Sequence, residues 1–258
     1  MGLGTNRYRG DVTSSDMNTL RDTLKVFNKI GAQVIDTSPN YGNSEEVLAH
    51  LLNEIDARQD VFMATKVDRE SAKDGLKRME ESFERLGEPI ELMQVHNLRG
   101  TKDQLENMKA WKEEGRFRYI GITTHRVQQH AEMERFMRAE PLDFIQVNYS
   151  LADRAAAERV LPLAIDRGIA VLVNRPFGNG RLFQAVDGAD LPEWAAEIDA
   201  SSWGQVFLKY IISHPANTIP IPGTTKPHHA QDNLSAMTGR LPDEALRKEM
   251  EAIMSKLM

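Results

Sequence analysis

Residues 61–97 read VFMATKVDRESAKDGLKRMEESFERLGEPIELMQVHN, and this stretch sets the pattern for the chain. It begins with the short apolar run Val61–Thr65, continues through the charged segment Ala72–Leu86, and returns to a second apolar run, Leu92–Val95. Short apolar runs predict strands, and apolar residues three or four positions apart predict a helix with one buried face. The stretch therefore predicts a strand, a helix and a second strand parallel to the first.

The same alternation runs along the rest of the chain. Six further apolar runs are the segment at Leu3, Gln33–Ile35, Tyr119–Ile122, Phe144–Val147, Ala170–Val173 and Thr218–Ile221. Eight strand–helix units close naturally into a barrel, so we predict an α/β fold, one (β/α)8 TIM barrel as a single domain over residues 1–258. A doubly wound open sheet is the alternative, but no G-x-G-x-x-G follows the first strand. Arg240 onward predicts a terminal helix outside the barrel.

Composition excludes several classes of function. The net charge of −6 argues against general affinity for nucleic acid, and no apolar run approaches the ~20 residues that span a bilayer. The chain has no cysteine, which rules out disulfides, thiolate metal sites and a cysteine nucleophile. His125 and His130 are awkwardly spaced for one helical face, and His228 and His229 lack a nearby carboxylate cluster, so we predict no metal site.

The amino terminus is unusual because a predicted core strand directly follows Met1. We therefore expect that an upstream segment is missing from the chain. No signal peptide is visible. The sequence as it stands predicts a cytoplasmic location, and a periplasmic one if an export leader has been removed. It predicts nothing about oligomeric state.

Polar side chains gather where consecutive predicted strands end. Asp36 and Tyr41 follow the second strand, Lys66 the third and His96 the fourth. In such barrels the active site lies at the carboxyl ends of the strands, so these four side chains should lie close together at that end of the barrel. Each also has a structural explanation, as a turn cap, a packed ring, a solvated lysine or a core histidine. Four in succession around one ring favour a functional site.

Their chemistry suits the reduction of a carbonyl group. Hydride addition leaves an alkoxide that needs a proton, and a free tyrosine is a poor acid because its pKa is about 10. A neighbouring ammonium lowers the pKa of a phenol by stabilising its anion. Asp36 would keep Lys66 charged, and His96 would donate a hydrogen bond to the substrate oxygen.

These motifs resemble the signatures of the aldo-keto reductase family. The similar segments are Gly2–Thr5, Asp36–Gly42, Ala64–Val67, Leu92–Asn97 and Ile221–Thr224 through Asn233. The segments Gln146–Leu151 and Val173–Phe177 are similar to a bacterial subgroup that often carries a twin-arginine leader. The resemblance implies a barrel that binds NADPH and a small carbonyl substrate. It also implies Asp36, Tyr41, Lys66 and His96 as the catalytic tetrad, with Tyr41 as the acid.

The resemblance further implies a cofactor site. Thr123, Thr124 and Gln146 would hold the nicotinamide carboxamide. Separately from the resemblance, free N–H groups at a helix amino terminus suit an anion, so we expect Thr224 and Lys226 to contact the 2′-phosphate. Other expected cofactor contacts are Gly4, Thr5, Asn174, Pro176, Phe177, Gly223, His229 and Asn233. Asn174 stands where many relatives stack an aromatic ring on the nicotinamide. In the long segment Pro176–Ser201, Trp194 is the candidate for the substrate pocket.

Two classes of function remain. The intact tetrad favours an oxidoreductase that acts on aldehydes or ketones. The asparagine at position 174 leaves a cofactor-binding regulatory or redox-sensing barrel with slow turnover as the alternative. A barrel that uses Lys66 to form a Schiff base is weaker, because Asp36 and Tyr41 would then be superfluous.

Overall fold

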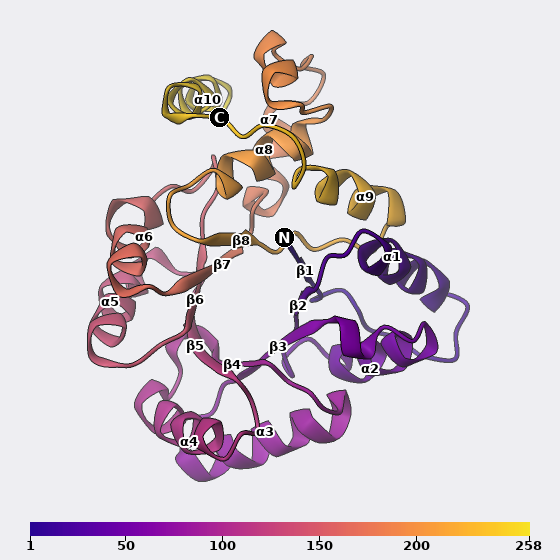
Figure 1. The fold of residues 1–258 in the computed structure, drawn as a ribbon, viewed down its shortest axis with the longest axis vertical. Coiled ribbons are helices and arrows are strands. Elements are labelled where there is room, and N and C mark those ends of the chain that lie inside the picture. The colour runs from indigo at the N-terminus through magenta and orange to yellow at the C-terminus, as the bar shows by residue number, and fades with distance from the viewer.

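In the computed structural model, which describes residues 1–258, a parallel eight-stranded sheet curls into a ring with helices outside it (Figure 1). The strands pair in chain order from β1 to β8. Gly4 of β1 bridges Gly223, and its N–H donates to the carbonyl of Pro222 over 3.4 Å, which joins the two edges of the sheet. The predicted barrel is confirmed, and the doubly wound open sheet is excluded.

The strands lie close to the predicted apolar runs. Their bounds are β1 (Gly2–Gly4), β2 (Val34–Asp36), β3 (Phe62–Val67), β4 (Leu92–Val95), β5 (Tyr119–Thr123), β6 (Phe144–Asn148), β7 (Ala170–Asn174) and β8 (Thr218–Pro220). β3 extends two residues past its predicted end. Lys66 therefore sits inside this strand, and the strand geometry fixes the direction of its side chain.

Helices lie between successive strands and after the last strand, on the outside of the ring. They are α1 (Met17–Lys29), α2 (Ser44–Glu54), α3 (Ala72–Leu86), α4 (Thr101–Glu113), α5 (His130–Ala139), α6 (Ala156–Arg167), α7 (Arg181–Ala185), α8 (Trp203–Ile212), α9 (Pro227–Ser235) and α10 (Glu244–Leu257). The alternation predicts a helix at the position of α2 but does not give its bounds. Its buried Val47, Leu48, Leu51 and Leu52 are spaced for one helical face, which is the signal that identifies it.

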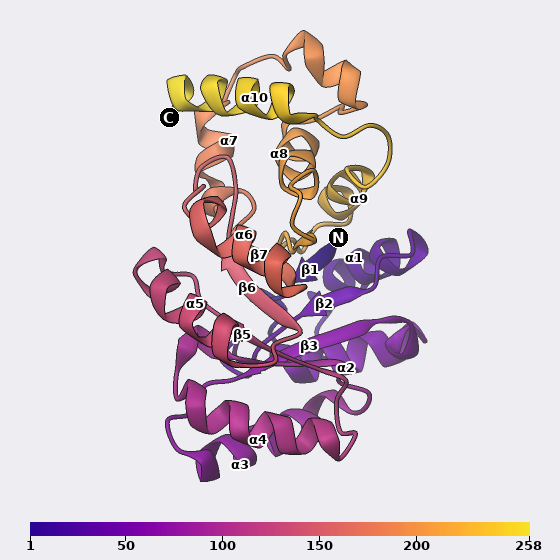
Figure 2. The ribbon, with the colours of Figure 1, turned by 60° about the vertical axis from the view of Figure 1, so that its left-hand side comes forward.

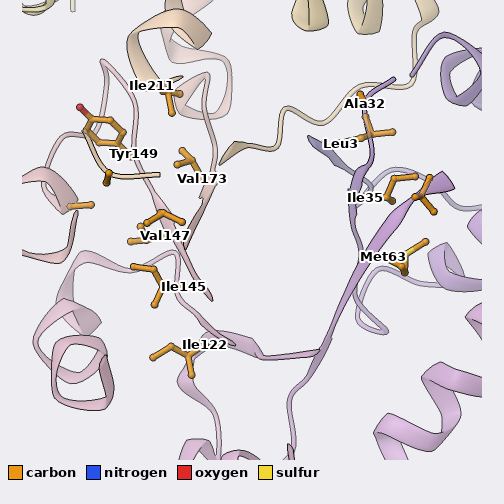
Figure 3. Close-up of a cluster of buried hydrophobic side chains, with 14 of the residues drawn as sticks. Leu3, Ala32, Ile35, Met63, Ile122, Ile145, Val147, Tyr149, Val173 and Ile211 are labelled. Carbon is orange, nitrogen blue, oxygen red and sulfur yellow. The ribbon is translucent and has the colours of Figure 1, made fainter. Parts of the chain in front are cut away.

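The alternation of strand side chains separates two apolar regions. Outward residues such as Ile35, Ile122 and Val147 join the main core between strands and helices (Figure 3). Inward residues include Ala64 and Leu92, which belong to a small separate cluster inside the barrel. Because strand side chains repeat every two residues, the next inward positions toward the carboxyl ends are polar: Asp36, Lys66, Gln94 and Gln146. These polar side chains thus lie next to the apolar cluster inside the barrel, on its side toward the carboxyl ends of the strands.

The predicted terminal helix is α10, which lies outside the ring of strands, beyond α8 (Figure 2). Arg247 of this helix donates to the hydroxyl of Tyr149 over 2.7 Å, and Glu251 accepts from the hydroxyl of Tyr210 over 2.5 Å. The two tyrosine hydroxyls are themselves 3.0 Å apart. These bonds dock α10 on the barrel. None of the helices is both long and apolar enough to span a membrane.

Candidate active site

A cavity of about 620 Å³ opens at the carboxyl ends of the strands. Only 4 of its 21 lining residues are hydrophobic, so the ligand that fills it meets mainly polar groups. The predicted site residues that line it are Gly4, Thr5, Asp36, Tyr41, Lys66, His96, Thr123, Gln146, Asn174, Pro176, Phe177 and Gly223. The structure therefore brings together all four proposed catalytic side chains and eight of the proposed cofactor contacts.

Asp36 and Lys66 form a buried ion pair at the floor of this cavity. The Nζ atom of Lys66 lies 2.7 Å from Oδ2 of Asp36 and donates to the carbonyl of Thr37 over 2.7 Å. Both side chains are at most 3% exposed. Burial opposes the ammonium form, but the negative charge of Asp36 and the neighbouring Tyr41 outweigh it and raise the pKa of Lys66 above its ordinary value. Lys66 is therefore a permanent cation at neutral pH.

Gln94 supports this pair from the adjacent strand β4. Its Nε2 donates to Oδ1 of Asp36 over 3.2 Å, so both carboxylate oxygens are bonded. The sequence analysis missed Gln94. The available signal was a glutamine within an otherwise apolar strand, two residues before His96 and so on the same face.

Tyr41 and His96 complete the group above the ion pair. Nζ of Lys66 lies 5.3 Å from the centroid of the Tyr41 ring. The Tyr41 and His96 rings meet edge to face, with centroids 6.1 Å apart. A phenol, an ammonium and an imidazole thus converge on one volume of the cavity.

His96 is neutral at physiological pH. Burial is the main cause, and the positive charges of Lys66 and His125 add to it, which together lower the pKa of His96 to about 3. Its Nδ1 lies 3.2 Å from the hydroxyl of Ser38. The imidazole is thereby suited to donate or accept a hydrogen bond, and it does not act as a cation.

Gln146 provides the clearest test of whether a nicotinamide cofactor fits. Its side-chain oxygen and nitrogen are both buried, and neither has a hydrogen-bond partner in the protein. Buried amides without partners are uncommon and costly, and Gln146 lines the cavity. A carboxamide offers one donor and one acceptor, which are the complements of a free side-chain amide. The residue fits the group that the resemblance implies.

The two predicted glycines have a packing role in the same wall. A Cβ atom on Gly4 would lie 2.9 Å from the carbonyl oxygen of Ile221, and one on Gly223 would lie 3.2 Å from that of Gly4. Side chains at these positions would separate β1 from the end of β8. Thr5 is fully buried beside them, and its hydroxyl donates to the carbonyl of Asp36 over 2.8 Å.

Several predicted residues lie outside the cavity wall. Thr124 is fully buried, and its hydroxyl donates to Gln129 over 2.5 Å. Only its backbone bonds residues of the wall: its carbonyl accepts from Asn174, and its N–H donates to the carbonyl of Gln146. Trp194 does not line the cavity and packs on the main core, so the structure does not support its assignment to the substrate pocket. Trp194 lies in the short 3-10 helix Glu193–Ile198, and its indole nitrogen is buried.

The remaining predicted cofactor residues surround the start of α9. Lys226 is the N-cap residue and Pro227 begins the helix. Lys226 and His229 are exposed, whereas Asn233 is buried. The hydroxyl of Thr224 accepts from the N–H of Lys226 over 3.1 Å. These residues are next to the main cavity along the chain, but they do not line it.

The cavity also contains polar residues to which the sequence analysis gave no role. Asn6 and Arg7 follow β1, Asn97 follows β4 and His125 follows β5. His125 Nδ1 lies 2.8 Å from Oδ1 of Asn97. Arg7 forms no ion pair within the chain, although the protein as a whole is acidic. Arg175 also lines the cavity and holds a left-handed backbone conformation, with φ of 47°.

The chain matches a family model and several known proteins. The model described as the aldo/keto reductase family matches residues 1–253. An oxidoreductase of Schizosaccharomyces pombe is 29% identical, over 96% of this chain and 84% of its own. A protein of Escherichia coli named NADH-specific methylglyoxal reductase is 25% identical, over 97% of this chain and 94% of its own.

A solved structure has the same fold. An aldo/keto reductase from Klebsiella pneumoniae, crystallised in complex with NADP and acetate, superposes with a TM-score of 0.80 at 24% identity. The match covers 98% of this chain and 90% of that chain.

Proposed function

The chain belongs to the aldo-keto reductase family, and we propose that it reduces aldehydes or ketones to alcohols with NADPH, using Tyr41 as the proton donor. The observation that carries the proposal is the buried Asp36–Lys66 pair beneath the ring of Tyr41. A buried ion pair is weak evidence for stability, because its desolvation is costly. Its place next to a phenol points to catalysis.

Lys66 prepares Tyr41 to give up a proton. The ammonium lies 5.3 Å from the centroid of the Tyr41 ring, where it stabilises the negative charge that develops on the phenol oxygen as the proton leaves. Asp36 and Gln94 hold the ammonium in place. When bound, NADPH supplies the hydride that adds to the carbonyl carbon. The Tyr41 proton passes to the carbonyl oxygen, and an alcohol results.

His96 orients the substrate. A neutral imidazole can donate one hydrogen bond to the carbonyl oxygen from the nitrogen that faces the cavity. The same oxygen then lies between His96 and the hydroxyl of Tyr41, whose rings meet edge to face. This position directs the oxygen to the proton donor.

The residues that would hold NADPH form two groups. Gln146, Thr123, Asn174, Pro176 and Phe177 line the same cavity. Gln146 and Thr123 would hold the carboxamide, and the other three would form the wall beside the nicotinamide. Thr224, Lys226, His229 and Asn233 surround the start of α9, where free N–H groups and a lysine suit the 2′-phosphate. The name of the Escherichia coli relative makes NADH the alternative cofactor to be tested.

The test is to follow NADPH oxidation with a panel of aldehydes and ketones. Tyr41→Phe removes the proton donor and keeps the ring, so we expect turnover to fall at least ~10²-fold while NADPH binding is unchanged. If Tyr41→Phe turns over the carbonyl compounds at the rate of the parent protein, Tyr41 is not the acid. Tight NADPH binding without turnover of any carbonyl in the parent protein would favour the sensor alternative.

A further inference from the structure

Ser38 is fully buried beside the imidazole of His96, in the loop between β2 and α2. Its Oγ atom lies 3.2 Å from Nδ1 of His96. The same oxygen accepts the backbone N–H of Asn40 over 3.2 Å. The sequence places Ser38 and His96 58 positions apart, and only the barrel brings them together.

The hydrogen bonds decide which atom is the donor. The Asn40 N–H already occupies one acceptor site on Oγ, and the Ser38 hydroxyl hydrogen has no acceptor other than Nδ1 of His96. If Nδ1 carried the proton instead, the serine hydrogen would be buried without a partner, which costs free energy. The favourable arrangement is a serine hydroxyl that donates to an unprotonated Nδ1.

We propose that Ser38 is a positioning residue that holds His96 in the tautomer with its proton on Nε2. His96 lines the cavity, and Nε2 is the ring nitrogen without a protein partner, so the proton points to the bound carbonyl oxygen. Ser38 itself does not touch the substrate. The catalytic consequence rests on the proposed carbonyl reduction, whereas the tautomer is a property of the free protein.

Neighbouring contacts leave Ser38 as the side chain responsible for this choice. The N–H of Asn97, the next residue, donates to the hydroxyl of Thr123 over 3.1 Å and anchors the backbone. The Tyr41 ring contacts the imidazole edge to face and offers no bond to Nδ1. Because burial keeps the ring neutral, with a pKa of about 3, one nitrogen carries the proton and the other does not.

Nitrogen-15 NMR of histidine-labelled protein tests the tautomer without substrate or cofactor. The resonances of His96 are identified by their loss in His96→Gln. We expect a protonated Nε2 and a hydrogen-bonded, unprotonated Nδ1 in the parent protein. In Ser38→Ala the Nδ1 resonance should move toward that of a free acceptor or split between two tautomers. A ring protonated on Nδ1 in the parent, or unchanged resonances in Ser38→Ala, would overturn the proposal.

Kinetics test the consequence. Ser38→Ala should lower kcat with a carbonyl substrate by about three- to tenfold, the usual effect of one neutral hydrogen bond, and leave NADPH affinity within twofold. Ser38→Thr, which keeps the hydroxyl, should restore most of the rate. Ser82→Ala removes another fully buried serine hydroxyl, on α3, and should change neither the rate nor the resonances.

The outcomes separate the two proposals. A parent protein that reduces no carbonyl would contradict the proposed function, while its His96 resonances would still confirm or overturn the tautomer. An active Ser38→Ala with the parent kcat would overturn the role of Ser38 in positioning. If Ser38→Thr does not fold, as its melting temperature would show, the NMR comparison of Ser38→Ala with Ser82→Ala decides.

Discussion

His96 shows how burial assigns a role to one side chain. In water an imidazole changes charge near pH 6.5, but here burial and the nearby cations Lys66 and His125 lower its pKa to about 3. Lys66 is buried in the same cavity but stays charged, because its Nζ atom lies 2.7 Å from Oδ2 of Asp36. Of the two basic groups in this cavity, His96 is therefore neutral and Lys66 is positively charged. One acts by its field and the other by a hydrogen bond.

The charge states of His96 and Lys66 predict how kcat/KM depends on pH below neutrality. His96 stays uncharged well below neutrality, so kcat/KM for carbonyl reduction should show no ionisation near 6.5 when measured between about pH 5 and 8. The charge of Lys66 should also be constant there, because its pKa is raised from 10.5. A histidine-like inflection that disappears in His96→Gln would contradict the assignment. The control is the melting temperature at each pH, which excludes unfolding as the cause.

The start of α9 carries the residues that we propose select between NADPH and NADH. The helix has no acidic residue in its first turn, and Lys226 is its N-cap. The exposed side chain of Lys226 makes no ion pair with a carboxylate of the chain. A free lysine at a helix amino terminus is well placed to bind a phosphate, because the helix dipole and the ammonium attract the same charge.

We therefore expect NADPH to bind more tightly than NADH. A charge-assisted hydrogen bond contributes about 1.5–3 kcal/mol, so Lys226→Ala should weaken NADPH roughly tenfold to a hundredfold and spare NADH. Fluorescence titration of both cofactors measures this. Lys256→Ala removes a positive charge from α10 and serves as the control. Equal affinities in the parent protein would point to an enzyme that uses NADH or both cofactors.

The loops after β1, β4 and β5 contribute polar side chains to the cavity wall. Asn6, Arg7, Asn97 and His125 line the cavity there, whereas Phe177, Phe183 and Ile221 line it from the segments that follow β7 and β8. Small-molecule pockets are usually mainly apolar. A polar wall with an unpaired arginine suits small hydrophilic carbonyl compounds.

We expect activity with several small aldehydes, with high KM because little ligand surface is buried. A benzaldehyde that carries a carboxylate should have a kcat/KM roughly tenfold above that of benzaldehyde itself, through a charge-assisted contact with Arg7. Arg7→Gln should remove this difference and leave the rate with benzaldehyde unchanged. A preference for the neutral compound, or exclusive selection of one substrate, would contradict the expectation.

The molecule as a whole is tied together by buried polar contacts between distant segments. The Tyr149–Arg247 bond links the end of β6 to α10, 98 positions away. His214, after α8, packs edge to face on Tyr149, and its Nδ1 accepts the N–H of Ala216 over 3.1 Å. Burial, with a smaller effect from Arg247, lowers the pKa of His214 to about 4. This contact region depends on a neutral imidazole.

Stability should consequently fall on acidification. Above pH 6.5 His214 is uncharged in both the folded and the unfolded protein. Between pH 6.5 and about 4, His214 binds a proton in the unfolded chain but not in the folded protein. The free energy of unfolding therefore decreases as the pH falls through this range. Thermal unfolding of His214→Asn, which keeps an acceptor, should show a shallower loss. His50→Asn, at an exposed histidine of α2, should retain the parental slope.

Local patterns in the sequence were sufficient for the barrel and for the position of the tetrad. Strand and helix periods are properties of neighbouring residues, and parallel strands necessarily bring their carboxyl ends to one edge. Asp36, Lys66 and His96 could thus be placed together without coordinates. The role of Gln146 came from the family resemblance, and its inward position at the end of β6 agrees with strand alternation.

Which partner each side chain takes depended on packing between segments far apart in the chain. The Ser38–His96 and Gln94–Asp36 contacts join residues 58 positions apart, and no local period specifies them. Thr124 and Trp194 occupy plausible places in the sequence, yet one bonds Gln129 and the other packs on the core. Side-chain direction in loops follows from the space that neighbouring elements leave, and that space exists only after the barrel has closed.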